Sequence, residues 1–363
     1  MTDDNKVAPH NIVALSPDAA LADGLWWLKT VGEVNDSRNG RVVVSPVPVI
    51  TAYPNPDHRV MLSPVRDANP FFHLFEALWM LAGRNDVAKI AVYAKQMEAF
   101  ADDGLQWGAY GFRWREFFAF DQLAEIVELL DREPLTRRAV MTMWAPNGDL
   151  VASEGAGGIT AKDVPCNTQV YFDLTRGRLN MTVTNRSNDI VWGAYGANLV
   201  HMSMLMEFVA GAVGAPLGTY YQFSNNYHAY IDRPDVQRLM HTNGASSRPA
   251  EWTVNVVPVN AYEREGLKTY PMVGSRWRSW LNDCEAFVDD PLTDRAYNDL
   301  FFNAVAAPMV AAHAAYKRDE LDVALREASH IVAPDWRRAA TEWLVRRVAK
   351  RQETARRMME GGE

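Results

Sequence analysis

The sequence of 363 residues predicts an α/β fold, with mixed strands and helices in the first two-thirds and nearly all helix in the last third. Segments 169–174 and 179–184 alternate apolar and polar residues as strands do, and the link 175–178 predicts a hairpin. In the last third, apolar residues recur at helical spacing beneath charged faces. We therefore expect a mixed domain at 15–234 and a mostly helical extension at 235–363 packed on it.

The first elements are predicted from local signals. Residues 1–14 are expected to be unstructured, and Ser16 followed by proline is typical of the start of a helix that extends to about Val31. The polar residues 35–40 predict a tight loop. Residues 41–51 are rich in valine and predict a strand, which its two prolines restrict to an edge or a bulge.

Further helices are predicted where apolar residues recur at helical spacing. In chain order these segments are 71–82, 86–100, 121–131, 199–212, 235–241, 275–289, 292–317, 321–329 and 334–357. Methionines in the fourth segment are typical of a buried core helix. Residues 139–144 predict a strand, and the Gly-rich residues 147–160 predict a long connection.

Composition narrows the class of protein. Apolar residues make up 48% of the chain, and the net charge of -8 is spread over both signs, which argues against a surface for nucleic acid or membrane. The richest apolar run, 199–213, is interrupted by His201 and Glu207, so no membrane span is expected. Two cysteines, Cys166 and Cys284, without a signal-peptide pattern predict reduced thiols and a cytoplasmic location.

Cys166 is the first candidate for chemistry. It follows Pro165 just before one strand of the hairpin, and Arg186 lies beside the next strand, where a cation would favour the reactive thiolate. A lone cysteine is more often a small buried apolar residue, so a structural role is the alternative from these residues alone. Zinc-ligand, phosphate-loop and dinucleotide-binding motifs are absent from the sequence, so neither a metal nor a nicotinamide cofactor is expected.

Several short segments become specific when they are taken together. In chain order they are Phe75-Glu-Ala-Leu-Trp-Met-Leu-Ala-Gly83, Tyr110-Gly-Phe-Arg-Trp-Arg115, Asp121-Gln122, Arg137-Arg138, Pro165-Cys166, Asn185-Arg-Ser-Asn-Asp189, Gly193 to Asn198 and Asn226-Tyr-His-Ala-Tyr230. Over residues 25–232 this set resembles the thymidylate synthase family. The resemblance implies that family's mixed sheet with surrounding helices. It also implies transfer of a one-carbon unit from 5,10-methylenetetrahydrofolate to C5 of a pyrimidine nucleoside monophosphate.

The resemblance implies roles for four side chains in the chemistry. Cys166 would be the nucleophile that attacks C6 of the pyrimidine, and Tyr110 would assist removal of the C5 proton. Glu76 would manage protons through ordered water, and Asp189 would help to order the folate and that water. For Glu76 the alternative is an exposed helix position, because glutamate is rarely buried.

The resemblance also implies residues that bind the nucleotide. Those for the phosphate are Arg38, Arg137, Arg138, Arg186 and Ser187. Arg137 and Arg138 would reach across an interface into a second copy's site, so a homodimer is expected. The alternative is an ordinary surface pair. His228 and Tyr230 would hold the sugar hydroxyl, or else form a core pair with satisfied polar tips.

One departure from the family concerns the product. Two family tryptophans shield the exocyclic methylene intermediate so that hydride reduces it to a methyl group, and their places here hold about Gln96 and Ala99. A smaller, more polar lining admits water, which would give a hydroxymethyl group. This departure favours a pyrimidine nucleotide 5-hydroxymethylase. Thymidylate synthase itself is the first alternative, and a nucleotide-binding homologue without chemistry is the second.

A second departure concerns the base. The segment ending at Asn198 is one residue longer than the family pattern, and Asn198 aligns with the base-reading asparagine if the extra residue lies in the loop; Ala197 is the other choice. An asparagine amide serves uracil in one orientation and cytosine in the other. The base thus stays open between dUMP and dCMP. The extension at 235–363 carries no recognised motif, and phage DNA modification is one setting for such an enzyme, in the host cytoplasm.

Overall fold

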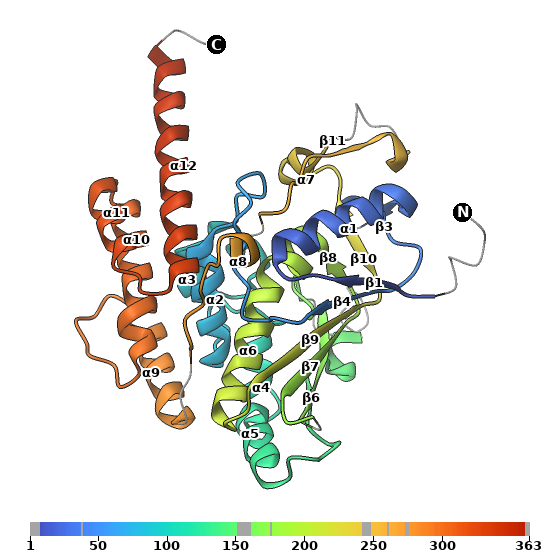
Figure 1. The fold of residues 1–363 in the computed structure, drawn as a ribbon, viewed down its shortest axis with the longest axis vertical. Coiled ribbons are helices and arrows are strands. Elements are labelled where there is room, and N and C mark those ends of the chain that lie inside the picture. The colour runs from blue at the N-terminus through green and yellow to red at the C-terminus, as the bar shows by residue number, and fades with distance from the viewer. Residues whose placement is uncertain are drawn as a thin grey trace.

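The computed structural model describes residues 8–37, 39–150, 161–174, 176–241, 248–259, 261–272 and 276–359 (Figure 1). Its α-helices are α1 (Pro17–Val31), α2 (Pro70–Leu81), α3 (Val87–Ala91), α4 (Tyr110–Arg115), α5 (Gln122–Arg132), α6 (Asn198–Ala212), α7 (Pro234–Leu239), α8 (Ala261–Arg264), α9 (Trp277–Asp289), α10 (Ala307–Lys317), α11 (Leu321–Ser329) and α12 (Pro334–Met359). Its strands are β1 (His10–Val13), β2 (Glu33–Ser37), β3 (Gly40–Val44), β4 (Val49–Tyr53), β5 (Val140–Thr142), β6 (Asn167–Asp173), β7 (Leu179–Asn185), β8 (Asn188–Asp189), β9 (Leu217–Ser224), β10 (Tyr227–Tyr230), β11 (Met240–His241) and β12 (Thr253–Val254).

The main sheet has six strands in the order β1-β4-β9-β7-β6-β5. β6 and β7 pair antiparallel, as the predicted hairpin requires, whereas β7 and β9 pair parallel. A second sheet has the order β2-β3-β10-β8. The mixture of parallel and antiparallel pairs with many helices confirms the predicted α/β fold with a mixed sheet.

Two helices form the layers behind the main sheet. α6 packs on β7 and β9, and α2 packs on α6. Every residue of α2 is buried, and Met202, Met204 and Met206 of α6 are at most 1% exposed, which confirms their predicted core role. Such helices are buried on all sides, because they have no polar face to turn toward water.

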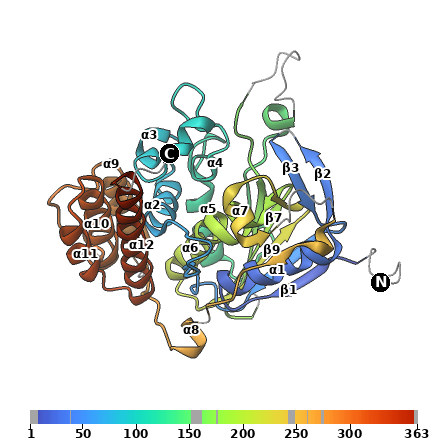
Figure 2. The same ribbon diagram turned by 90° about the horizontal axis from the view of Figure 1, so that it is seen from above.

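The C-terminal helices complete the core around α2. α9, α10 and α12 all contact α2, and both views show α9–α12 gathered beside it, on the side away from the sheet (Figures 1 and 2). The Phe71 and Trp343 rings lie 5.5 Å apart, and Cys284 donates its S–H to the Leu78 carbonyl at 3.3 Å. One apolar core therefore runs across the boundary predicted at residue 234, and that boundary stays a prediction.

Helix starts follow their sequence signals closely. The Ser16 side chain accepts a hydrogen bond from the Ala19 N–H, and α1 ends at Val31, both as predicted. The segment predicted at 71–82 is α2, which is additionally capped by Asn69. Side-chain caps satisfy helix N–H groups that would otherwise lack a partner, so these ends are well defined.

Three predictions near the N-terminus are wrong. Residues 10–13 form strand β1 rather than an unstructured start, and residues 33–37 form strand β2 where a loop was predicted from residue 35. The single strand predicted at 41–51 is two strands, β3 and β4, which belong to different sheets. Long-range pairing decides these cases: within the described residues, β1 pairs only with β4, which lies far along the chain.

The helix predicted at 86–100 is also wrong as a single element. It is divided into α3 and a 3-10 helix at Lys95–Phe100. The Tyr93 carbonyl between them accepts a hydrogen bond from the Asn69 side chain at 3.0 Å, and the Tyr93 ring stacks on Phe75 at 4.3 Å. These tertiary contacts bend the chain where a continuous helix would carry it past α2.

Candidate active site

Cys166 lies immediately before β6, at the open end of the β6–β7 hairpin. Its carbonyl accepts a hydrogen bond from the Arg186 N–H at 3.0 Å, so the two residues face each other across the hairpin. The thiol is half-buried and not in a disulfide. Burial raises the pKa of the Cys166 thiol to about 11, and the Arg186 charge opposes that rise. The Arg186 charge thus favours the thiolate, but with a pKa of about 11 the Cys166 thiol is mostly neutral at neutral pH.

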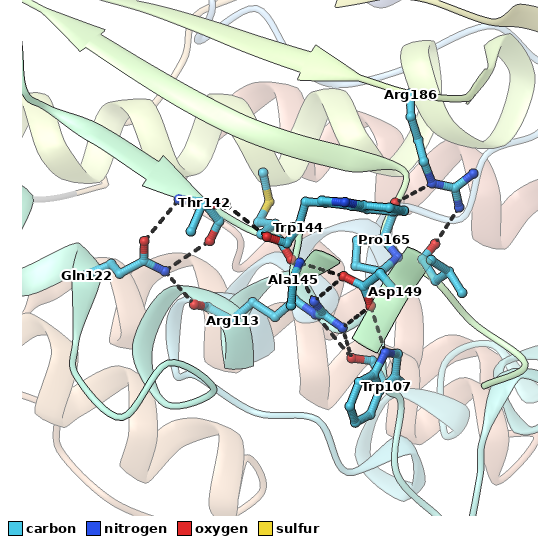
Figure 3. A network of polar contacts seen from close by, with 11 residues as sticks. Trp107, Arg113, Gln122, Thr142, Trp144, Ala145, Asp149, Pro165 and Arg186 are labelled. Atoms are coloured by element: carbon cyan, nitrogen blue, oxygen red, sulfur yellow. Dashed lines mark hydrogen bonds and ion pairs between the residues drawn. The ribbon is translucent and has the colours of Figure 1, made fainter. Parts of the chain in front are cut away.

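The Arg186 guanidinium holds the segment that precedes the cysteine. Its Nε donates to the Pro165 carbonyl at 2.8 Å and its Nη2 to the Val164 carbonyl at 3.0 Å, as Figure 3 shows for Pro165. The guanidinium also lies over the Trp144 ring at 5.6 Å. A positive charge is therefore fixed beside the thiol by two carbonyls and an aromatic face.

Tyr110 is the first residue of α4 and lies close to Cys166. Burial raises the pKa of the Tyr110 hydroxyl well above its ordinary value, and the backbone N–H groups of Asn167 and Cys166 oppose this rise. The next residue, Gly111, allows the approach: a Cβ there would lie 1.9 Å from the Met80 carbonyl oxygen of α2. Glycine is required where two backbones come this close.

A buried polar network holds α4 in place (Figure 3). Arg113 and Asp149 form an ion pair with no exposed side-chain surface, with Nη1 2.7 Å from Oδ2. Trp107 donates its Nε1–H to Asp149 at 2.8 Å, and Gln122 donates to the Arg113 carbonyl at 2.8 Å. Because every member has partners, the network fixes the loop after β5 against the helix that carries Tyr110.

Asn198 is the first residue of α6 and is buried, with 8% exposed. The segment predicted to hold one extra residue forms a π-helical turn, η4 (Ile190–Ala197), whose backbone leaves helical geometry at Gly196. Such turns accommodate an inserted residue without shifting the following helix. A Cβ on Gly193 would lie 2.8 Å from Asn188 Oδ1 and 3.1 Å from Asn198 Nδ2, so glycine leaves room for two amides there.

His228 and Asp189 are register partners of β10 and β8. Burial raises the pKa of Asp189, the nearby His228 opposes this, and one carboxylate oxygen caps η4 by accepting from the Val191 N–H at 3.1 Å. The His228 and Tyr230 rings lie 5.2 Å apart, edge to face. The strands therefore bring together the predicted sugar-binding pair and the predicted folate-ordering carboxylate.

Glu76 is buried in α2, with 4% of its surface exposed, so the alternative of an exposed helix position is wrong. Its Oε2 lies 2.9 Å from Nε2 of His201 on α6. The two atoms lack the alignment of a hydrogen bond, and within the described residues neither has a hydrogen-bond partner. His201 was not predicted as a site residue.

The remaining predicted residues lie at the surface, beside Arg186 or outside the described residues. Arg137 and Arg138 are exposed, and Arg138 pairs with Glu133 at 2.8 Å on the surface of a single chain. Ser187 is partly buried beside Arg186, and Arg38 lies outside the described residues. Gln96 and Ala99 are both exposed, whereas Met97 between them packs toward the core.

Sequence reasoning missed a set of buried polar side chains. Within the described ranges, each of these residues has at least one side-chain N or O atom that is buried without a hydrogen-bond partner: Asn167, Asn185, Asn188, His201 and Gln222. Buried polar atoms are normally paired, so such atoms are typical of a site completed by water or ligand. Polar residues within otherwise apolar strands and helices were the available signal.

The fold and the site together define a one-carbon transferase of the thymidylate synthase family. The thymidylate synthase family model matches residues 29–284, and the chain belongs to this family, as the sequence predicted. The match extends past the boundary predicted at residue 234. Members of this family act on pyrimidine monophosphates, with methylenetetrahydrofolate as the one-carbon donor. No helix within the described parts of the chain is both long and apolar enough to span a membrane.

Particular relatives are similar over much of the chain. The deoxyuridylate hydroxymethyltransferase of Pseudomonas phage M6 is 42% identical over 94% of this chain and 96% of its own length. The deoxyuridylate hydroxymethyltransferase of Delftia phage PhiW-14 is 27% identical over 86% of this chain and 90% of its own length. That of Bacillus phage SP01 is 37% identical over 54% of each chain. Because the first alignment covers 94% of this chain, it extends into the C-terminal segment that carries α9–α12.

Proposed function

We propose that this protein is a deoxyuridylate 5-hydroxymethylase that uses 5,10-methylenetetrahydrofolate. The observation that carries the proposal is similarity along almost the full length to a protein named for that activity. The absence of indoles at Gln96 and Ala99 supports a product made by water addition rather than by hydride transfer. Of the two bases left open by the sequence, the relatives' names favour uracil.

The site residues support the following roles. The Cys166 sulfur bonds to C6 of uracil, and Arg186 beside it offsets the negative charge of the thiolate and of the phosphate. Tyr110, whose hydroxyl lies at the Cys166 backbone, assists removal of the C5 proton. Asn198 binds the base edge, and Glu76 handles protons through water. Ser187, Asp189, His228 and Tyr230 keep their predicted roles in binding the phosphate, the folate and the sugar.

The residues of this site fit the folate, a large polar one-carbon donor, as well as a nucleotide. Among the residues that the structure describes, the two side-chain polar atoms of Asn167, next to Cys166, are buried without hydrogen-bond partners, as expected of a site completed by polar ligands. The folate supplies the methylene carbon that becomes the new substituent at C5. Asn167 and Asp189 are the residues that we assign to ordering it and its water.

We further propose a homodimer in which the main sheet packs against that of a second copy. A row of side chains crosses five strands on one face: Ala52, Tyr221, Thr182, Tyr171 and Val140. Tyr221, Tyr171 and Val140 are 38–39% exposed, while their neighbours along each strand are buried. A continuous half-exposed apolar and aromatic row is typical of an interface. Arg137 and Arg138, with Arg38, remain proposed phosphate ligands, and a cytoplasmic location remains a prediction.

The test of this function is a product assay with dUMP, dCMP and CMP in parallel, each with methylenetetrahydrofolate. We expect 5-hydroxymethyl-dUMP by mass, with much less product from the other two nucleotides. A product with the mass of dTMP would indicate thymidylate synthase instead. Nucleotide binding without any product would indicate a homologue that has lost chemistry.

A further inference from the structure

His201 meets Glu76 in the layer between the main sheet and the C-terminal helices. It lies one turn after Asn198 on α6, so the two side chains share a face of that helix. Its Nε2 lies 2.9 Å from Glu76 Oε2, and the side chains of the pair are only 2% and 6% exposed. A titratable pair is thereby placed one helical turn from Asn198, the residue that we propose binds the base.

The hydrogen-bonding groups of this pair are incomplete. Within the described residues, Nδ1 and Nε2 of His201 and Oε2 of Glu76 are all buried without a hydrogen-bond partner. Leaving a buried polar group unpaired is unfavourable, so a purely structural pair would be expected to align and satisfy itself. The unpaired nitrogen and oxygen atoms of His201 and Glu76 instead suit a water molecule, which needs two to four polar partners.

We propose that His201 is a positioning residue which, with Glu76, holds the water that adds to the exocyclic methylene. The proposal rests on the hydroxymethylase function and adds a residue to it. Water is the co-substrate that distinguishes hydroxymethylation from reductive methylation. A hydroxymethylase therefore needs a fixed place for water close to the base, and this pair provides buried donors and acceptors one helical turn from Asn198.

Hydration of the exocyclic methylene is a conjugate addition followed by an elimination. The water oxygen bonds to the methylene carbon while the Glu76 carboxylate takes a water proton, and the double-bond electrons move through C5 to the carbonyl oxygen at C4. The resulting enolate re-forms that carbonyl and the C5–C6 double bond, and it expels the Cys166 thiolate. His201 orients the carboxylate and the water and is not itself consumed.

The test separates water addition from the steps before it. With dUMP tritiated at C5, tritium release reports formation of the exocyclic methylene, and the hydroxymethyl product reports its hydration. In His201→Leu we expect the ratio of released tritium to product to rise on the order of 10-fold, because displacement of a reactant is costly. A small thiol added to the buffer should then capture the methylene as a thioether. His201→Gln, which keeps a donor near the Nε2 position, should restore part of the product.

The matched control is His313→Leu, at a buried histidine of α10 that packs on Phe71 and Tyr93. It should leave the ratio of tritium release to product unchanged. A proportional fall of tritium release and product in both His201 variants would overturn the proposal. The unsubstituted protein tests the function separately: if it makes dTMP, the hydroxymethylase assignment fails whatever the variants do.

Discussion

The Arg186 N–H donates to the Cys166 carbonyl at 3.0 Å, so the backbones of the two residues are paired at the open end of one hairpin. Two residues 20 positions apart in sequence are thereby set by β-sheet register rather than by flexible loops. The guanidinium is further held by two carbonyls just before the cysteine. The proposed nucleophile and its cation are in this way pre-organised for attack on a bound ring.

Replacing Cys166 by Ala should abolish product formation while leaving dUMP binding nearly intact, because the sulfur forms the covalent bond and contributes little to the rest of the pocket. Turnover and calorimetric binding measure the two effects. Cys284→Ala is the control, since that thiol is fully buried beside α2 and far from the hairpin in sequence. If the Cys166→Ala variant still turned over substrate, Cys166 would not be the nucleophile.

Alkylation of Cys166 by iodoacetamide should be slow at neutral pH and should speed up with rising pH. The thiol pKa of about 11 means that the neutral form dominates below that pH, so the reactive thiolate increases about tenfold per pH unit between pH 7 and 10. Arg186→Leu should slow the reaction at each pH, because the charge that lowers this pKa is lost. Peptide mass spectrometry gives the rates, and unchanged rates in the variant would contradict the pairing.

Asp149→Asn should lower the free energy of unfolding by about 3–5 kcal/mol, because it leaves the fully buried Arg113 charge without its counter-ion. Turnover should also fall, since the same network supports the helix that carries Tyr110. Urea denaturation measures the first effect. Glu320→Gln removes an exposed pair with Arg318 and should leave the unfolding curve nearly unchanged. Equal effects of the two substitutions would show that the buried network does not stabilise the fold.

Asn198→Asp should shift the preference from dUMP toward dCMP. A neutral amide donates to O4 and accepts from the N3–H of uracil, whereas a carboxylate accepts from the exocyclic amine of cytosine and is repelled by O4. The ratio of kcat/KM for the two nucleotides measures the shift. If the ratio stayed as in the unsubstituted protein, the base would be bound by another side chain, with Asn188 the nearest candidate.

The parts of the fold predicted correctly are those with complete local signals. The cap at Ser16, the apolar spacing of α2 and the alternation of β6 and β7 each specify an element without distant partners. β1 has no such signal: Val13 is 68% exposed, and the strand exists because it pairs with β4. Short edge strands of this kind depend on tertiary context rather than on local pattern.

The site residues also divide into those that a local motif indicates and those that depend on distant contacts. Short motifs located Cys166, Arg186 and Asn198, because the resemblance assigns each of them a role. In the sequence, His201 only interrupts an apolar run. No local pattern links it to Glu76, which lies more than 100 residues away. Contacts between distant helices leave no trace in local spacing, so only the structure brings this pair together.

The most direct test of water addition to the methylene is the reaction with dUMP and methylenetetrahydrofolate in water labelled with heavy oxygen. We expect 5-hydroxymethyl-dUMP whose new hydroxyl carries the label from solvent, with no rise in dihydrofolate absorbance. Unlabelled dTMP accompanied by dihydrofolate would contradict it, because the methylene would then have been reduced by hydride rather than captured by water.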